Sequence, residues 1–376
     1  MAQYKTLVDK VSIPPNMKTK QKDYESQGTL AIVDQGKKLI GGYTNNAEMA
    51  LQCKLPVIVF CDHTCAVKFV NFPFGAGADG IKVLSPKNGI LPKYLFYGTQ
   101  YLTLRFPDKG YARHYQHIEK MDLPVPSIET QQNIVSSIEE LFSELDKGVE
   151  TLQTIKEQLA VYRQAVLKEA LNGIKGQPYT VKDVCKEIKV GIVIKPSQYY
   201  TDEQVGIKAF RSANVREFHV EDKNWAYLSI AGHQANARSI VHTGDILIVR
   251  SGYPGTACVV PEQFNGCNAI DILIAVPNRD LVLPEFLCAY TNSPLGKKFV
   301  NEKKRGVGQK HFNVSGYSKM LISVPSLDKQ EEIVKKIASR LSVCDSIERT
   351  VNTALAQAEA MRQSILKKAF EGELCK

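Results

Sequence analysis

The 376-residue sequence lacks long apolar runs. Stretches such as 55–60 (LPVIVF) and 245–249 (DILIV) are far shorter than the roughly 20 residues of a membrane-spanning helix. The first residues, MAQYKTLVDK, are polar and lack the apolar core of a secretory signal. The nine cysteines are odd in number and scattered, unlike the framework of a disulfide-rich secreted domain. We therefore expect a cytoplasmic protein with reduced thiols and no contact with a membrane.

Recognisable catalytic motifs are also lacking. The segment 72–80 (FPFGAGADG) is similar to the start of an S-adenosylmethionine pocket, but no (Asp/Asn)-Pro-Pro-(Tyr/Phe) loop accompanies it. We interpret its glycines as a turn between strands. Cys61, His63 and Cys65, near Cys53, lack the paired spacing of a zinc site. The segment 293–299 (SPLGKKF) is not an ATP-binding P-loop. From these segments we expect no metal site, no ATP-binding loop and no self-contained methyltransferase.

What the sequence does contain is an internal repeat. Residues 126–173 align with 325–372 at a constant offset of 199 without a gap, and 17 of the 48 positions are identical. The copies begin with PSIETQQNIV and PSLDKQEEIV, and each ends at a glycine, Gly173 or Gly372. Proline before the first turn and glycine after the last are typical boundaries of a helix. The repeat therefore predicts two long helices.

Apolar residues recur in each copy at spacings of three and four, which is typical of a coiled coil. In the first copy the stripe runs from Ile134 to Val166 and includes Leu141. Because one small module could not cover so long a stripe, we expect the helices to pack on each other as an antiparallel pair. The alternative is that each helix packs only on its own neighbouring domain. The predicted seam consists of Ile134, Ile138, Leu145, Leu152, Leu159, Val166, Ile333, Ile337, Val351, Ala358 and Ile365.

The blocks between the helices are distant relatives of each other. Residues 6–11 (TLVDKV) and 91–97 (LPKYLFY) have counterparts at 180–185 (TVKDVC) and 283–290 (LPEFLCAY). Between them lie short β-rich runs with Gly- and Asn-rich turns. The predicted fold is α+β, with two similar mixed α/β domains, 1–125 and 176–324, and two helices, 126–175 and 325–376. Two globular domains at the ends of a helical rod would follow.

The net charge of +9 is divided unevenly. Residues 1–125 carry +6 and residues 176–324 carry +5, whereas the helical segments carry −3 and +1. A positive bias in both modules is what two surfaces that face nucleic acid would show, although a mildly basic soluble protein would show it too.

This arrangement resembles the specificity subunits of type I restriction–modification systems over essentially the whole chain. In that family two target recognition domains alternate with two helical repeats, and the helix openings (PVPSIETQQNIV, SVPSLDKQEEIV) and ends (RQAVLKEALNG, RQSILKKAFEG) of this sequence fit the family pattern. A further family-like phrase is AIVDQGKKLIGGYTN, residues 31–45.

The resemblance implies a DNA-reading subunit that is not itself catalytic. It implies double-stranded DNA as the ligand, and two methyltransferase subunits and, through them, restriction subunits as partners. S-adenosylmethionine, ATP and Mg²⁺ would then bind to those partners. A coiled-coil adaptor without a DNA role remains the alternative.

Candidate DNA-contacting residues are polar or basic side chains that follow apparent strands or precede the helices. In the first module they are Gln35, Lys37, Lys38, Tyr43, His63, Arg113 and His114. In the second they are Arg211, Asn214, Arg216, Arg250, Ser251, Tyr253, Lys303, Lys304, Arg305, Gln309, Lys310 and His311.

Overall fold

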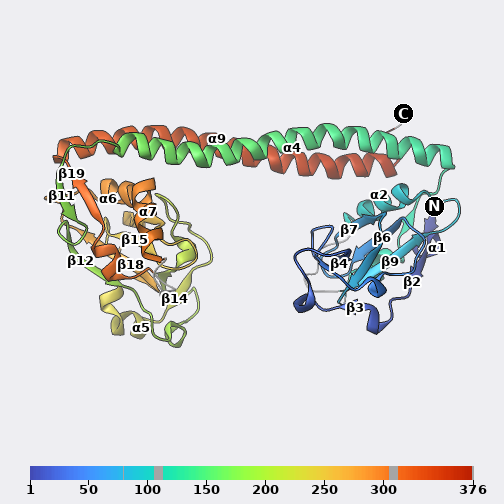
Figure 1. Ribbon diagram of the computed structural model, residues 1–376, viewed down its shortest axis with the longest axis horizontal. Helices are drawn as coiled ribbons and strands as arrows, with labels where there is room; N and C mark the ends of the chain where they lie inside the picture. The colour runs from blue at the N-terminus through green and yellow to red at the C-terminus, as the bar shows by residue number, and fades with distance from the viewer. Residues whose placement is uncertain (79, 106–112, 305–311, 375–376) are drawn as a thin grey trace. The chain divides into compact units, whose positions relative to one another are not determined.

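The structure, a computed structural model, describes residues 1–78, 80–105, 113–304 and 312–374 (Figure 1). The chain forms two compact units. Unit 1 contains residues 1–154 and 351–376, and unit 2 contains residues 155–350. Each unit therefore holds one globular module together with part of each long helix.

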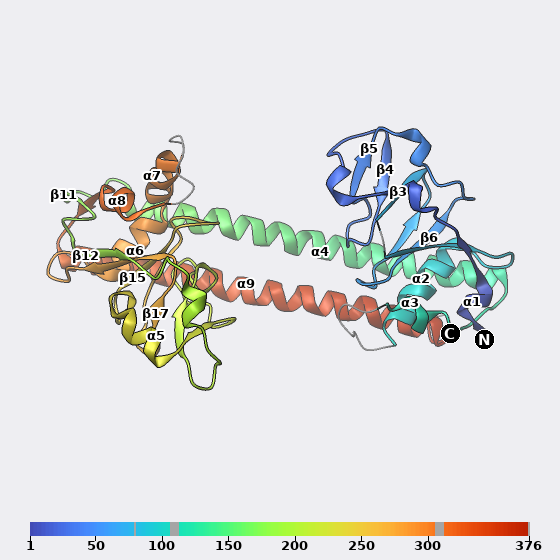
Figure 2. The same cartoon turned by 90° about the horizontal axis from the view of Figure 1, so that it is seen from below.

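The module of unit 1 is built from two sheets of four strands (Figure 2). The apolar run at 57–61 forms a wholly buried central strand of the first sheet, as its β-branched residues favour. The first sheet is antiparallel, in the order β2 (Val8–Val11), β9 (Ile81–Pro86), β6 (Val57–Cys61) and β7 (Val67–Val70). The second has the order β3 (Lys18–Thr19), β8 (Phe74–Gly77), β4 (Leu30–Val33) and β5 (Gly42–Thr44), and β8 is parallel to β3 and β4.

The module of unit 2 repeats this topology. Its antiparallel sheet has the order β12 (Cys185–Val190), β18 (Ile272–Pro277), β15 (Ile246–Val249) and β16 (Ala257–Val259). Its second sheet has the order β14 (Ala226–Leu228), β13 (Ile207–Phe210) and β17 (Asn268–Ala269), and β13 is parallel to β17 as β4 is to β8. The predicted pair of similar mixed modules is therefore confirmed.

The remaining elements connect the sheets to the long helices. In unit 1 they are β1 (Ala2–Gln3), α1 (Tyr4–Leu7), α2 (Pro92–Thr103), α3 (Tyr115–Ile118) and β10 (Asp122–Leu123). In unit 2 they are β11 (Gln177–Thr180), α5 (Ile230–Ala235), α6 (Pro284–Asn292), α7 (Pro294–Lys304), α8 (Val314–Ser318) and β19 (Leu321–Val324). Short 3₁₀ turns lie at Pro15–Met17, Gln21–Asp23, Ala47–Met49, Pro196–Tyr199, Ser212–Asn214, Ala237–Ser239 and Glu262–Phe264.

The repeated segments form α4 (Ile128–Leu171) and α9 (Leu327–Phe370), each 44 residues long. At a rise of 1.5 Å per residue, each measures roughly 66 Å. The hydroxyl of Ser127 accepts a hydrogen bond from the Thr130 amide at 3.2 Å, which satisfies one donor of the first turn of α4. After the helix ends, Gly173 and Gly372 have positive φ values of 68° and 81°, which glycine adopts without strain.

Within each unit, α4 and α9 run antiparallel, as predicted. In unit 2, Arg163 of α4 pairs with Asp345 of α9 at 2.6 Å, and Glu169, further along α4, pairs with the earlier Arg340 at 2.5 Å. In unit 1, the duplicated residues Arg362 and Asp146 form the equivalent ion pair. The same Arg–Asp contact therefore occurs once in each unit, with the roles of the two helices exchanged.

None of the predicted seam residues is exposed, but two other positions of the stripe in the first copy, Leu141 and Tyr162, are exposed. Leu141 is 39% exposed, and the adjacent Phe142 is buried instead, with the Arg362 guanidinium 4.4 Å from the centre of its ring. An α-helix has 3.6 residues per turn, so residues spaced alternately by three and four move gradually around the helix. Some positions of such a stripe therefore lie outside the buried face.

The beginning of each long helix packs on its neighbouring module as well as on the other long helix. Ile134 and Ile138 join a core that includes Tyr94 and Leu95 of α2, together with Ile365 and Leu366 of α9. In unit 2, Ile333 and Ile337 join a core with Phe286 and Leu287 of α6, together with Val166 and Leu167 of α4. The first turns of each helix therefore pack on their own module and on the partner helix at once.

The glycine-rich segment at 72–80 is not simply a turn. Its residues Phe74–Gly77 form the buried strand β8, and a Cβ at Gly77 would lie 2.5 Å from Cβ of Asp34. Glycine is needed there because another backbone approaches closely. Among the described residues, no helix is long and apolar enough to cross a membrane, and no cluster of His, Cys, Asp or Glu is arranged to hold a metal ion.

Candidate nucleic-acid interface

In unit 1, three loops meet at one end of the antiparallel sheet. They follow β4 (residues 34–38), follow β6 (62–65) and precede α3 (113–114). The Thr64 hydroxyl donates to the Gln35 carbonyl at 2.8 Å, and the amide of His114 donates to the Asp62 carbonyl at 3.1 Å. Segments that carry Gln35, His63 and Arg113 are thus brought together although they are far apart in the sequence.

The loop after β4 rests on a buried lysine. The Lys68 ammonium donates to the Asp34 carbonyl at 2.7 Å and lies 3.6 Å from its carboxylate, and only 3% of the Lys68 side chain is exposed. Burial and the nearby Asp34 carboxylate raise the pKa of Tyr24 to about 12, so its hydroxyl stays neutral beside this pair. Burial raises the pKa of the Cys61 thiol to about 11, so this cysteine is an inert packing residue. The loop thus has a rigid base from which the exposed Lys37 and Lys38 project.

Unit 2 repeats the arrangement with different residues. The loop after β15 begins at Arg250, whose carbonyl accepts from the Phe312 amide at 3.2 Å and whose Nε donates to the Phe312 carbonyl at 3.1 Å. The Arg250 guanidinium also pairs with Asp271 at 2.6 Å. The segment before α8 therefore meets the loop after β15, as the segment before α3 meets the loop after β6.

Beside it, the loop after β13 and the loop after β15 line a concave surface of about 560 Å³. Ser212 and Arg216 come from the first loop, and Ser251, Gly252 and Tyr253 come from the second. Tyr253 is 86% exposed in a turn between two glycines of positive φ, Gly252 and Gly255. Two segments that the sequence nominated separately, 211–216 and 249–255, thus form one surface, with an aromatic ring at its tip.

The nominated residues differ in their accessibility. Lys37, Lys38, Arg113, Arg216 and Tyr253 are exposed. Partly buried are Gln35, Tyr43, His63, Arg211, Arg250 and Ser251. Lys303 and Lys304 belong to α7, and Arg305, Gln309, Lys310 and His311 lie outside the described residues. The exposed residues are the ones best placed to reach a ligand.

Two nominated residues have a structural role instead. His114 is fully buried, with its Nδ1 2.9 Å from the Asp62 carbonyl. Asn214 is also fully buried, and its amide group donates to the carbonyls of Glu221 and Lys223 at 3.2 and 2.9 Å. Because neither side chain has exposed surface, we assign both to holding the loops in place rather than to the expected DNA contact.

Sequence reasoning missed Lys68 as the support of the first loop. Its position carried a usable signal, because alternation along β7 places Lys68 on the same buried face as Val70. A lysine at a buried position of a strand implies a specific partner.

A family model of the type I restriction modification DNA specificity domain matches residues 10–159 and 174–357. The chain belongs to this family. The two matched ranges accord with the two modules of one topology.

Among curated relatives in this specificity family, the type I restriction enzyme EcoBI specificity subunit of Escherichia coli is 27% identical over 278 residues. That match covers 67% of this chain and spans 58% of the length of the relative. The EcoR124I/EcoR124II specificity subunit of Escherichia coli is 23% identical over 372 residues, which cover 95% of this chain and 89% of that protein. The fold is also similar to that of a chain solved in a study of complex assembly and conformational transition of the type I R-M system. The TM-score is 0.65 at 16% identity, and the match covers 99% of this chain and 97% of that chain. That likeness establishes the fold.

Proposed function

We propose that this chain is the DNA-recognition subunit of a type I restriction–modification enzyme and reads a two-part target with its two modules. The observation that carries the proposal is the recurrence of one loop arrangement in both modules, at the same end of the antiparallel sheet. Homologous modules with different loop residues are suited to read different half-sites.

The exposed side chains suit the two components of DNA binding. Lys37, Lys38, Arg113 and Arg216 can neutralise phosphates, which supplies affinity without sequence preference. In this proposal the residues that line the concave surface of unit 2, together with the exposed Tyr253, contact bases or sense groove shape. Each module then contributes one half-site.

In this proposal α4 and α9 act as a spacer and as the platform for other subunits. Several large apolar side chains of these helices are exposed, namely Leu141, Val161, Val343, Ile347 and Met361. Val343 and Ile347 are one helical turn apart and share a face of α9, which suits a contact with another protein. The partners are two methyltransferase subunits and, through them, restriction subunits. S-adenosylmethionine, ATP and Mg²⁺ bind to those partners, and this chain contributes recognition but no catalysis.

Methylome sequencing tests the complete proposal. Cells that express the partner subunits are compared with and without this gene, and we expect one bipartite adenine-methylated motif to disappear with it. If no such motif is lost while the partners are present, the proposal fails.

A gel-shift titration of the purified chain separates DNA recognition from the adaptor alternative. We expect affinity for duplex DNA to fall steeply as salt rises, because bound phosphates release counterions. A chain that binds no DNA at low salt would be an adaptor.

A further inference from the structure

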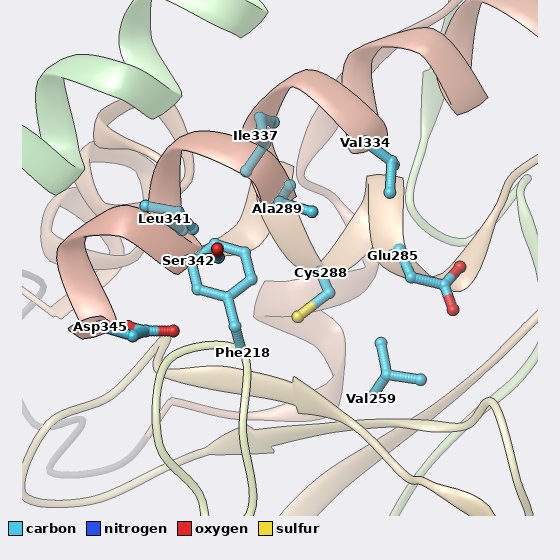
Figure 3. A pocket seen from close by; sticks show the side chains of 11 residues that line it. Phe218, Val259, Glu285, Cys288, Ala289, Val334, Ile337, Leu341, Ser342 and Asp345 are labelled. Carbon is cyan, nitrogen blue, oxygen red and sulfur yellow. The ribbon is translucent and has the colours of Figure 1, made fainter.

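A partly open pocket of about 290 Å³ lies in unit 2 between α6 and the first turns of α9 (Figure 3). Its walls include Cys288 and Ala289 of α6, Ile337 and Leu341 of α9, and Phe218. Glu285 and Asp345 lie at opposite ends of it in Figure 3. The pocket is thus an apolar space with a carboxylate on either side, near the lower end of the volumes that small ligands occupy.

The equivalent surface of unit 1 has a different chemistry. Helices α2 and α6 align at an offset of 192, with Leu91, Pro92, Leu95 and Thr99 identical to Leu283, Pro284, Leu287 and Thr291. With the offset of 199 for the long helices, Ala289 corresponds to Tyr97 and Leu341 to Phe142.

In unit 1 the rings of Tyr97 and Phe142 meet edge to face with their centres 5.8 Å apart. The depression that remains around them, of about 550 Å³, is lined by Glu139, Asp146, Lys147, Glu150 and Arg362 as well as by the rings. Ala289 and Leu341 therefore stand where unit 1 has two aromatic residues, and the space beside them is lined mainly by apolar side chains instead of the charged ones of unit 1.

The charges have diverged as well. In unit 1 Lys93 pairs with Glu139 at 2.6 Å across this surface. The aligned residues in unit 2 are Glu285 and Ala338, so the lysine has become an exposed carboxylate and its partner has become a methyl group. No ion pair involves Glu285 within the described part of the chain, whereas Asp345 is held by Arg163 at 2.6 Å. The Glu285 carboxylate could therefore form an ion pair with a positively charged group of a ligand.

Phe218 supplies an aromatic wall. Its φ of 68° lies in the left-handed region, which is rare for a bulky residue, and its amide donates to the Ala257 carbonyl at 3.0 Å. In Figure 3 its ring lies beside Leu341 and faces the pocket. An aromatic ring at this place offers stacking or edge contacts to a planar ligand and attraction to a nearby cation.

We propose that this pocket of unit 2 binds a small planar aromatic molecule that carries a positive charge, with the ring among Phe218, Ala289 and Leu341 and the charge beside Glu285. This pocket shares no lining residue with the concave surface that we assign to DNA, and the equivalent place in unit 1 differs because Tyr97, Phe142 and the Lys93–Glu139 pair stand there.

The test uses the full chain and three probes of one shape, namely tryptamine (cationic), indole (neutral) and indole-3-acetate (anionic), by titration calorimetry. We expect saturable binding in the order tryptamine, indole, indole-3-acetate. Glu285→Gln should weaken tryptamine about three-fold, the scale of one exposed ion pair, and leave indole unchanged. Ala289→Tyr, which introduces the residue of unit 1, should abolish binding of all three probes.

A measurement on the unaltered chain guards against a misfolded Ala289→Tyr variant. In methyl NMR spectra of the unaltered chain, tryptamine should shift the signals of Ala289 and Leu341, which line the pocket. The signals of Leu95 and Leu102, which lie in the core of unit 1, should stay in place. Absence of saturable tryptamine binding, or equal shifts of both pairs of signals, would overturn the proposal. Binding of a Trp-Lys peptide without binding of free tryptamine would also overturn it, by assigning the pocket to a protein partner. DNA affinity, measured in parallel, reports on the proposed function independently.

Discussion

The side-chain carbonyl of Gln131 accepts a hydrogen bond from the backbone amide of Leu91 at 2.9 Å. Its amide group donates to the carbonyls of Gly89 and Pro126 at 2.9 and 3.0 Å. In unit 2, Gln330 makes the same three contacts with Leu283, Leu281 and Pro325 at 2.8, 2.9 and 2.9 Å. Both glutamines are fully buried, so each joins the start of a long helix to the loop that precedes α2 or α6.

Gln131→Ala is expected to destabilise unit 1 by about 2–3 kcal/mol, because it removes three hydrogen bonds made by a fully buried side chain. Urea unfolding measures the change. The neighbouring exposed Gln132→Ala is the matched control and should stay within about 0.5 kcal/mol of the unaltered chain. Equal effects of the two substitutions would contradict the role given to Gln131.

The glutamine also illustrates what could be read from sequence. The two helices were predicted from the spacing of apolar residues and from the internal repeat, in which Gln131 and Gln330 are identical. Because the segment is duplicated, the same helical pattern appears twice in the sequence. The role of the glutamine could not be predicted, since its partners at 89 and 91 are set by the packing of α4 on α2. The same applies to His114 and Asn214, because the sequence does not show whether a polar residue in a predicted loop will be buried or exposed. The pocket beside Ala289 was unpredictable as well, because only the comparison with Tyr97 in a folded counterpart reveals it.

Lys37 and Lys38 are expected to contribute phosphate contacts. The double substitution Lys37→Ala/Lys38→Ala should weaken binding to all DNA sequences and reduce the slope of log affinity against log salt by about 2, near 0.9 per phosphate. Fluorescence anisotropy at several salt concentrations measures it.

The control for that variant is Lys5→Ala/Lys87→Ala, which removes the same charge at the opposite end of the sheet, where the Lys87 amide contacts the Leu7 carbonyl. The control should leave the salt slope unchanged. An equal fall in both variants would mean that net charge, and not the loop after β4, governs binding.

Tyr253 is expected to affect only one half-site. Tyr253→Ala removes the exposed ring and should relax base preference in the half read by unit 2, with a loss of about 1–3 kcal/mol, the range for one good contact to a base edge in a groove. Methylation of a randomised target library by the assembled enzyme would reveal this. The substitution Tyr200→Ala, at another exposed tyrosine, is the comparison. Relaxed preference in both half-sites would refute the assignment of one half to each module.

Asp245 predicts a pH dependence of stability. It is 4% exposed and accepts a hydrogen bond from the His242 amide at 2.8 Å, and burial raises its pKa above the usual value. A carboxyl group whose pKa is higher in the folded state than in the unfolded state stabilises the fold at a pH below the unfolded-state pKa of about 3.9. This contribution to the free energy of unfolding is lost as the pH rises through the folded-state pKa. Asp245→Asn keeps an acceptor without the charge. Its stability relative to the unaltered chain should therefore be greater at pH 7.5 than at pH 4.5 in urea unfolding, whereas the exposed Asp280→Asn should show no such trend.

The spacer role predicts that helix length sets the gap between half-sites. Because α4 pairs with α9 in both units, a seven-residue insertion must be made in both helices to keep the seam in register, for example after Ile155 and at the facing part of α9 near Val351. Seven residues add roughly 10 Å of helix, or about three base pairs at 3.4 Å each. Methylome sequencing should then show the same two half-sites with a gap about three base pairs longer. An insertion in α4 alone should misalign the seam and abolish methylation, because the inserted turn has no partner in α9. Altered half-site sequences at an unchanged gap would instead mean that the helices take part in base recognition and do not act as a spacer.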